Sequence, residues 1–161
     1  LGADEIELRW PNDLYARSRK LGGILAESKD QSAGAWISLG IGINIDLESE
    51  KLREKAPDGL SDRIICLREM IPAAESDPGK IALAIIEELQ PLYGQFQQGE
   101  KLGDILGGDL SVAGRKVLVE RPGKPVLRGT AAGIGGHGEL TVVDEEGATH
   151  EIVAAEVTWD C

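Results

Sequence analysis

The chain has 161 residues, of which 42% are hydrophobic and 28% are charged. This length and balance predict one medium folded domain, or one domain and a small second one. No run of about 18 apolar residues is present that could span a membrane. The formal net charge of −11 argues against non-specific nucleic-acid binding, which needs lysine and arginine to displace counterions. The two cysteines, Cys66 and Cys161, have no metal-ligand spacing, so we expect reduced thiols and a cytoplasmic location.

The N-terminal segment predicts a strand that begins almost at once. Apolar and charged residues alternate over residues 5–10, which is typical of a half-buried strand. Residues 14–19 are expected to form a connection and residues 20–28 a second strand, so that the two strands make a hairpin. Because the chain starts at Leu1 rather than methionine, and so close to a strand, we expect that preceding sequence is missing.

The clearest strand is predicted over residues 36–45, after a polar loop at residues 29–34. Its apolar side chains share one face, and small or polar residues share the other. The first face carries Ile37, Leu39, Ile41, Ile43 and Ile45, and the second carries Ser38, Gly40, Gly42 and Asn44. Glycine inside a strand often marks the close approach of a ligand or of another backbone. The pattern therefore predicts a core-facing side and, opposite to it, a flat floor.

Helical patterns follow this strand. Residues 46–58 are polar and are expected as a loop or an irregular helix, and residues 60–70 as a short helix. A longer helix is predicted over residues 78–97, with Asp77 as its cap and Pro78 at its first position. Pro91 is expected to kink or split this helix, because proline removes a backbone donor.

Short alternating segments separated by turn signals follow a glycine-rich connector at residues 99–108. These segments are residues 111–120, 126–131, 139–143, 150–153 and 156–159. Five short strands in so short a stretch predict a small barrel or sandwich. The predicted fold class is therefore α+β: a mixed or antiparallel sheet with helices over residues 1–107, and a small barrel or sandwich over residues 108–161.

The segment after the first strand combines groups suited to phosphate chemistry. Asn12 can donate to a phosphate oxygen, and Asp13 can help to hold hydrated Mg²⁺. Lys20 can neutralise charge on a phosphate or a carboxylate. Gly22 and Gly23 let the backbone approach a ligand closely. On these residues alone a plain solvated hairpin stays an open alternative, because a turn followed by a basic residue is common.

Two motifs resemble the signature of the biotin–protein ligase family. The first is Trp10-Pro11-Asn12-Asp13 followed by Arg19-Lys20-Leu21-Gly22-Gly23-Ile24-Leu25, and the second is Gly40-Ile41-Gly42-Ile43-Asn44. They occur in the family's order and at the expected distance, and a weaker resemblance covers the rest of the chain. The resemblance implies a class II synthetase-like ligase core that is incomplete, followed by an SH3-like β-barrel.

The same resemblance implies ATP- and Mg²⁺-dependent activation of biotin. In the family, the biotin carboxylate attacks the α-phosphate of ATP, giving biotinyl-5′-AMP and pyrophosphate, and a lysine of a biotin carboxyl carrier domain then takes the biotin. Such catalysis depends mainly on positioning and on electrostatic stabilisation. The match implies that Lys20 is the catalytic residue and that Asp13 is the Mg²⁺ ligand. The residues implied to bind biotin are Lys20, Gly22, Gly23, Gly40 and Gly42. The residues implied to bind ATP are Arg9, Asn12, Asp13 and Asn44.

The other distinctive residues are assigned no catalytic role. We expect the tryptophans Trp10, Trp36 and Trp159 to pack in a core. We expect Arg17 and Arg19 to be surface charges. No serine, cysteine or acid is expected to be arranged around His137 and His150.

Four departures from the family pattern bear on the expected activity. The upstream Arg/Gly-rich loop that closes over the adenylate is absent, and Arg9 stands where the family usually has lysine. Residues 134–138 lack an aspartate that the family tends to have, and Asp160 replaces an arginine. We therefore expect the isolated chain to be weak or inactive.

The expected partners are a biotin carboxyl carrier domain and the missing N-terminal half of the ligase domain, with a homodimer left open. No membrane and, through this segment, no nucleic acid is expected. Two alternatives stay open: a non-catalytic binding or interaction module derived from a ligase, and a relative that resembles lipoate ligases.

Overall fold

The computed structural model describes residues 6–31, 34–46, 62–72, 76–100 and 112–159. The chain divides into two compact units, one made of Leu1–Leu8 and Asn12–Ile81, the other of Arg9–Pro11 and Ala82–Cys161. The domain boundary predicted between residues 107 and 108 lies outside the described residues, and so does most of the loop or irregular helix expected at residues 46–58.

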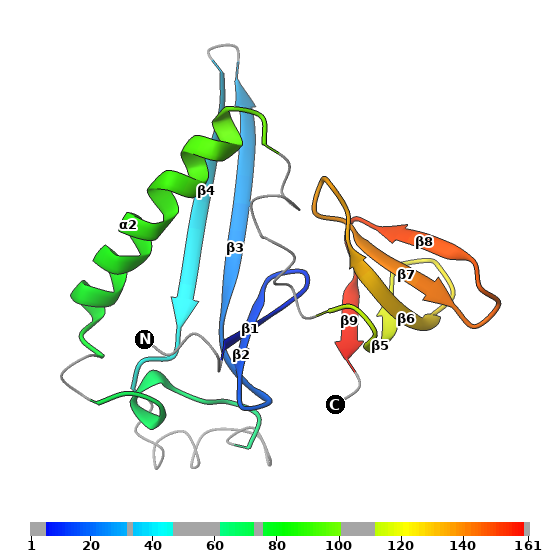
Figure 1. Cartoon of the computed structure of the whole chain (residues 1–161), viewed down its shortest axis with the longest axis horizontal. Helices are drawn as coiled ribbons and strands as arrows, with labels where there is room; N and C mark the ends of the chain where they lie inside the picture. The colour runs from blue at the N-terminus through cyan, green and yellow to red at the C-terminus, as the bar shows by residue number, and fades with distance from the viewer. Residues whose placement is uncertain (1–5, 32–33, 47–61, 73–75, 101–111, 160–161) are drawn as a thin grey trace. The chain divides into compact units, whose positions relative to one another are not determined.

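A four-stranded sheet dominates the N-terminal part of the chain (Figure 1). Its strands are β1 (Ile6–Arg9), β2 (Asp13–Ala16), β3 (Arg19–Gln31) and β4 (Gly34–Ile43), in the order β1-β2-β3-β4. The strands predicted at residues 5–10, 20–28 and 36–45 are confirmed. Two predictions are wrong: β2 occupies part of the expected connection, and β3 and β4 extend into the expected polar loop, pairing as far as Gln31 and Gly34.

The turn between β2 and β3 consists of Arg17 and Ser18, whose φ angles are 49° and 60°. Both residues therefore adopt the left-handed conformation that tight hairpin turns require and that usually selects glycine or asparagine. Neither residue signals such a turn, which explains why the sequence pattern did not reveal β2.

The helix expected at residues 60–70 is wrong. Only Leu67–Glu69 forms a short 3₁₀ turn, η2, and Ile64 makes an isolated parallel bridge with Lys20. The backbone N–H of Lys20 donates to the Arg63 carbonyl at 2.7 Å, and the N–H of Ile65 donates to the Lys20 carbonyl at 3.0 Å. The backbone groups of Arg63 and Ile65 therefore form hydrogen bonds with β3 instead of with a helical turn. The most buried residues of this unit include Ala16, Leu21, Ile65, Cys66 and Leu67.

The long helix α2 (Pro78–Gln97) is confirmed. The Asp77 side chain accepts a hydrogen bond from the Lys80 N–H at 2.9 Å, as expected of an N-cap. The expected split at Pro91 does not occur, because the helix runs through this residue without a break. Among the described residues, no helix has both the length and the apolar character needed to cross a membrane.

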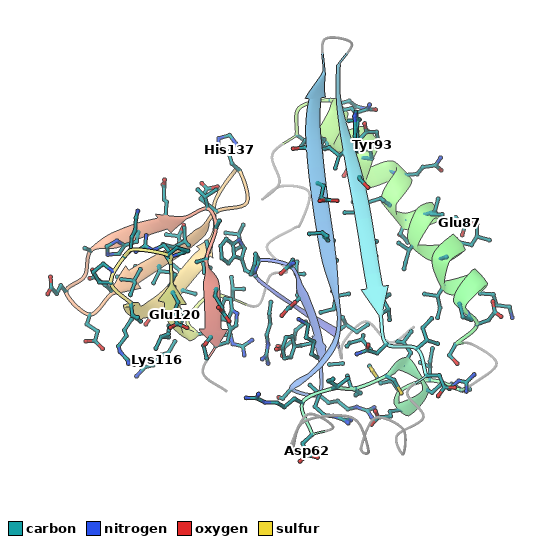
Figure 2. All side chains as sticks on the ribbon, turned by 180° about the vertical axis from the view of Figure 1, so that it is seen from behind. Asp62, Glu87, Tyr93, Lys116, Glu120 and His137 are labelled. Atoms are coloured by element: carbon teal, nitrogen blue, oxygen red, sulfur yellow. The ribbon has the colours of Figure 1, made fainter. Side chains whose placement is uncertain are left out.

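The five strands predicted in the C-terminal part are confirmed, and they form one antiparallel sheet (Figure 1). Its strands are β5 (Lys116–Glu120), β6 (Leu127–Ile134), β7 (Leu140–Asp144), β8 (Thr149–Ile152) and β9 (Glu156–Trp159), in the order β8-β7-β6-β5-β9. Side chains alternate along β5: Val117 and Val119 are buried, whereas Lys116 and Glu120 are exposed at its two ends (Figure 2).

One continuous core fills the second unit. It comprises Trp10, Val112, Val117, Val119, Ala131, Leu140, Val142, Ile152 and Trp159. The Trp10 indole donates to the Gly138 carbonyl at 2.8 Å, and the Trp159 indole donates to the Trp10 carbonyl at 3.4 Å. The packing roles predicted for Trp10 and Trp159 are confirmed, but that of Trp36 is wrong, because Trp36 is 49% exposed.

Candidate functional site

The pairing of β3 with β4 gives this sheet two chemically different faces. Directly paired residues of an antiparallel ladder lie on the same face. Gly23 pairs with Gly42, and Leu25 pairs with Gly40. We call the side of Gly23, Gly40 and Gly42 the glycine face. The opposite side, the apolar face, carries Ile24, Ile37, Leu39 and Ile41.

A β-bulge decides on which face Lys20 lies. Leu14 pairs with Gly22, but the next residue, Tyr15, pairs with Lys20, so Leu21 is an extra residue in β3. Strict alternation would place Lys20 on the apolar face with Gly22. Because a bulge shifts the alternation by one residue, Lys20 lies instead on the glycine face.

An ion pair confirms this placement. The Lys20 ammonium lies 2.6 Å from the Asp13 carboxylate, and Asp13 pairs with Gly23 on the glycine face. Both side chains are partly exposed, so the pair itself contributes only about 0–1 kcal/mol to stability. Its significance is geometric: it holds a cation with three donors on the face that carries Gly23, Gly40 and Gly42.

The glycines of the two motifs differ in what a side chain would meet. A Cβ on Gly22 would lie 2.2 Å from the Gly42 carbonyl oxygen, so the close approach of β3 and β4 already requires this glycine. On Gly23, Gly40 and Gly42 the nearest atoms would be at 3.4, 3.7 and 3.8 Å. These three positions have room for a methyl group within the chain, which makes them the open floor that the alternation predicted.

The two asparagines of the motifs are engaged with backbone carbonyls. The Asn12 amide donates to the Ile24 carbonyl at 2.9 Å. The Asn44 amide donates to the carbonyls of Lys20 and Ile65, each at 3.3 Å. The remaining predicted residue, Arg9, belongs to the second unit and is buried, with 6% exposure. The structure therefore brings together Asn12, Asp13, Lys20, Gly23, Gly42 and Asn44 within the first unit.

Glu69 is a charged anchor that the sequence did not indicate. Its carboxylate lies 2.8 Å from the Arg19 guanidinium and accepts a hydrogen bond from the Cys66 N–H at 3.2 Å. Arg17 donates to the Glu69 carbonyl at 3.4 Å. Arg17 is exposed and Arg19 partly exposed, as expected of surface charges, but both also tie the β2–β3 turn to η2. The spacing of Cys66 and Glu69, typical of a capping box, was the available signal.

These contacts also shift the titration of Glu69. Partial burial acts to raise the pKa of its carboxyl group, but the hydrogen bonds from Arg19 and Cys66 and the charge of Arg19 outweigh it, so the pKa lies below its ordinary value. The carboxylate is thus held in its charged form, in which it keeps Arg19 in place.

The histidines lie in the second unit. His137 lies in the turn between β6 and β7 (Figure 2), and no catalytic partner accompanies it among the described residues. The His150 ring, however, lies 2.6 Å from the Asp144 carboxylate, so the expectation that no acid accompanies His150 is wrong. The hydrogen bond with His150, together with the N–H groups of Ala148 and Glu146, lowers the pKa of Asp144.

No cluster of three or more His, Cys, Asp or Glu residues that could hold a metal ion occurs in the described part of the chain. The expected Mg²⁺ site thus depends on Asp13. Mg²⁺ is commonly bound by one or two carboxylates together with substrate phosphates, so a single carboxylate on the glycine face fits such an ion.

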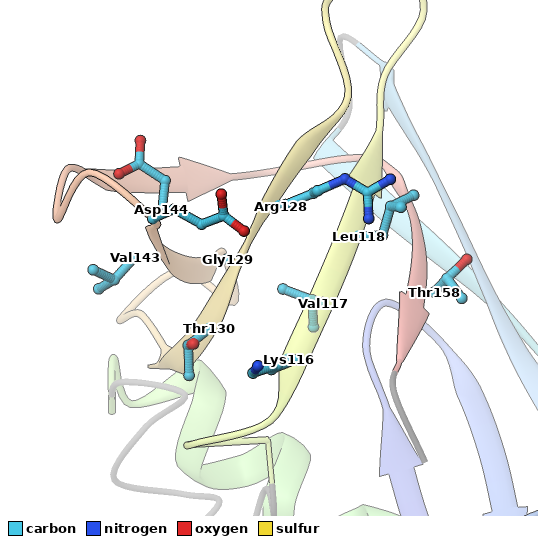
Figure 3. A pocket seen from close by; sticks show the side chains of 10 residues that line it. Lys116, Val117, Leu118, Arg128, Gly129, Thr130, Val143, Asp144 and Thr158 are labelled. Atoms are coloured by element: carbon cyan, nitrogen blue, oxygen red, sulfur yellow. The ribbon is translucent and has the colours of Figure 1, made fainter.

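A hollow of about 360 Å³ lies on the second sheet (Figure 3). It is lined by Lys116, Val117, Leu118, Arg128, Gly129, Thr130, Val143, Asp144, Glu145 and Thr158. None of the residues predicted from the two motifs lines it.

Comparisons with known proteins agree with the motifs. Residues 2–44 match the model of the biotin/lipoate A/B protein ligase family. The biotin–acetyl-CoA-carboxylase ligase of Mycobacterium tuberculosis is 31% identical over 155 residues, which cover 95% of this chain and 53% of that protein. The bifunctional ligase/repressor BirA of Escherichia coli is 34% identical over 99 residues, or 61% of this chain and 29% of that protein.

Solved structures show the same likeness. The apo biotin protein ligase of Aquifex aeolicus superposes with a TM-score of 0.71 at 24% identity, covering 96% of this chain and 65% of that one. The same enzyme in complex with biotin and ATP gives a TM-score of 0.69, covering 62% of that chain.

The likeness to the Aquifex structures confirms the predicted α+β class: the fold is that of a ligase domain with a small β unit after it. The sequence matches are to biotin–protein ligases in particular, so the resemblance predicted from the two motifs is confirmed and the chain is a relative of these enzymes. It spans about half the length of the mycobacterial relative, 53%.

Proposed function

We propose that the chain is the Lys20-bearing part of a biotin–protein ligase. Together with the rest of a ligase domain, it would activate biotin with ATP and pass it to a lysine of a biotin carboxyl carrier domain. The observation that carries the proposal is the Lys20 ammonium on the glycine face, beside Asp13. Two further findings support the proposal. The relatives are named as biotin ligases, and the Aquifex protein binds biotin and ATP.

The first chemical step joins two anions, and Lys20 suits it. A carboxylate oxygen of biotin attacks the α-phosphorus of ATP, the bond from that phosphorus to the bridging oxygen breaks, and pyrophosphate leaves with the electron pair. Both reacting groups are negatively charged, so an ammonium held at their meeting point lowers the repulsion between them. The open positions at Gly23, Gly40 and Gly42 would let the ligand lie against the backbone.

The second step needs no further charge from this chain. The amine of the carrier lysine attacks the biotinyl carbonyl, AMP leaves, and the amine loses a proton. Positioning of the adenylate then determines the rate, and the glycine face would provide one wall for it.

We assign the ATP side to Arg9, Asn12, Asp13 and the end of β4 at Asn44, and Mg²⁺ to Asp13. The Asp13 carboxylate has one oxygen beside Lys20, which leaves the other for an ion. Mg²⁺, when bound, would offset the charge of the phosphates.

We also propose a domain division near residue 107, a cytoplasmic location, and dependence of activity on the upstream Arg/Gly-rich loop.

The proposal is tested by biotin transfer to a carrier domain, with ATP and Mg²⁺ present and the upstream half of a ligase domain supplied. We expect transfer by the complemented chain and a loss of about 100-fold or more after Lys20→Ala, as for removal of a charged hydrogen-bonding group. Lys124→Ala, in a turn of the second unit, is the matched control and should leave transfer unchanged. Absence of transfer, or full transfer after Lys20→Ala, would contradict the proposal. Competition between biotin and lipoate distinguishes the lipoate alternative.

A second candidate function, a non-catalytic interaction module, is favoured by the hollow in the second sheet (Figure 3). Lys116 and Arg128 both line it, and neither forms an ion pair within the described residues, although the chain is strongly acidic. Asp144 and Glu145 also line the hollow, but Asp144 is engaged by His150. Two cations beside them suit an acidic segment of a partner. Under this alternative, Lys116→Glu with Arg128→Glu abolishes partner binding, and Lys20→Ala has no effect on it.

A further inference from the structure

The bulge that orients Lys20 is fastened by residues outside its own pair of strands. The Lys20 N–H donates to the Arg63 carbonyl at 2.7 Å, and the Lys20 carbonyl accepts from the Ile65 N–H at 3.0 Å. The next carbonyl, that of Leu21, accepts from the Asn44 N–H at 2.8 Å. Three segments that are distant in sequence therefore meet at the backbone of Lys20.

The side chain of Asn44 completes this junction. Its Nδ2 atom lies 3.3 Å from the Lys20 carbonyl oxygen and 3.3 Å from the Ile65 carbonyl oxygen. A primary amide has two N–H donors, so both are used within the protein. They connect the two segments that fix the bulge from either side.

We infer that Asn44 is a positioning residue for Lys20, acting through the bulge in β3. The inference rests on the proposed function, in which the Lys20 ammonium meets the reacting anions. It assigns to Asn44 a role different from direct contact with ATP: the amide keeps Leu21 as the extra residue, and so keeps Lys20 on the glycine face. Loss of the anchor favours regular alternation, which turns Lys20 toward the apolar face.

A double-mutant cycle separates the two roles. The affinity of the 161-residue chain for biotinyl-5′-AMP is measured by calorimetry for the wild type, Asn44→Ala, Lys20→Met and the double variant. We expect Lys20→Met to weaken binding about 100-fold and Asn44→Ala about 10-fold. In the Lys20→Met background, Asn44→Ala should change the affinity less than two-fold, because the group on which Asn44 acts is gone.

Asn12→Ala is the matched control, since its amide also donates to a backbone carbonyl, that of Ile24, but does not touch Lys20. Its effect should be the same in both backgrounds. If Asn44→Ala weakens binding by the same factor with and without the Lys20 ammonium, Asn44 acts on the ligand directly and the inference is overturned.

Amide hydrogen exchange tests the anchor without any ligand, and so remains decisive if the proposed function fails. Asn44→Ala, or Asn44→Asp as a variant of nearly equal shape, should speed exchange at the N–H groups of Lys20 and Ile65. Exchange at Ile24, whose N–H donates to the Asn12 carbonyl at 2.8 Å, should not change. Unaltered exchange at Lys20 and Ile65 in both variants would overturn the inference even if biotin transfer is found.

Discussion

The strands of the two sheets have similar alternating sequence patterns, but their apolar side chains are buried to different extents. In the second sheet, apolar residues at alternate positions, such as Leu140 and Val142, are completely buried. In β4 the alternation is longer and more regular, yet Ile37, Leu39 and Ile41 are 58%, 42% and 37% exposed. Alternation thus identifies a strand and its apolar face, but burial also requires a second layer of structure.

This difference corrects one expectation from the sequence. The apolar face of β4 was predicted to be core, but its side chains Ile37, Leu39 and Ile41 are partly exposed. The second sheet, in contrast, buries its apolar side chains in one continuous cluster that includes Trp10 and Trp159. The comparison predicts that equal substitutions in the two sheets have unequal costs.

The largest expected effect is that of Leu140→Ala. Leu140 is completely buried, so its truncation should lower the free energy of unfolding by about 2–5 kcal/mol. Leu39→Ala is the matched variant on β4, and it should cost less than about 1 kcal/mol, because this side chain already meets solvent. Urea denaturation followed by tryptophan fluorescence measures both. Equal costs would show that the apolar face of β4 is buried in solution.

The next effect concerns glycines that hold strands together. Gly22→Ala would place a Cβ 2.2 Å from the Gly42 carbonyl oxygen, so we expect a loss of about 1–3 kcal/mol from strain in the β3–β4 ladder. Gly129→Ala in the second sheet, where the Cβ would lie 2.4 Å from the Val143 carbonyl oxygen, should cost a similar amount.

Gly42→Ala is the control for this prediction, because its Cβ would have no neighbour closer than 3.8 Å. It should leave the denaturation midpoint nearly unchanged and weaken only the binding of a ligand on the glycine face. A midpoint lowered as much as by Gly22→Ala would contradict the open floor that the proposed function requires.

The two sheets also differ in how far their local sequence determines them. In the second sheet, all five strands were predicted, and the turns carry Gly123, Gly138 and Gly147, with φ angles of 69°, 88° and 84°. Local chemistry determined these turns, because glycine is the residue that adopts positive φ without strain. Local patterns therefore sufficed to identify the strands. One short turn joins each consecutive pair from β5 to β8, whereas β9 pairs with the distant β5.

The first sheet depends on contacts between distant residues, which a local pattern does not contain. The motifs indicated Asp13 and Lys20 as neighbours in a site, and the ion pair between them is present. The bulge at Leu21 was not predictable, because it depends on residues 63–65 and on Asn44. For Glu69 the spacing from Cys66 was a local signal, but its partner Arg19 lies 50 positions earlier and is not part of that pattern.

Smaller effects are expected at the turns. Ser18 has a φ of 60°, a conformation that costs an L-residue about 1–2 kcal/mol. Ser18→Gly removes this strain but loses about 0.5–1 kcal/mol of chain entropy, so we expect a net gain in unfolding free energy of about 0.5–1 kcal/mol. Gly147→Ala, at a φ of 84° in the second sheet, should be destabilising. Thermal denaturation measures both, and a loss of stability in Ser18→Gly would refute the strained turn.

The smallest effect is a pH dependence that arises at Asp144 in the second sheet. The hydrogen bond with His150, followed by those from Ala148 and Glu146, lowers the pKa of Asp144 below its ordinary value of 3.8. A carboxyl group with a lowered pKa stabilises the fold at pH values above its unfolded pKa, and this contribution disappears as the pH falls through the lowered, folded value. His150→Gln should therefore raise the pKa of Asp144 and make the second unit unfold at a less acidic pH. An NMR titration of the Asp144 carboxyl carbon tests the shift of its pKa. His137→Gln is the control and should leave this titration unchanged. An unaltered titration in His150→Gln would show that the turn N–H groups alone hold this carboxylate in its charged form.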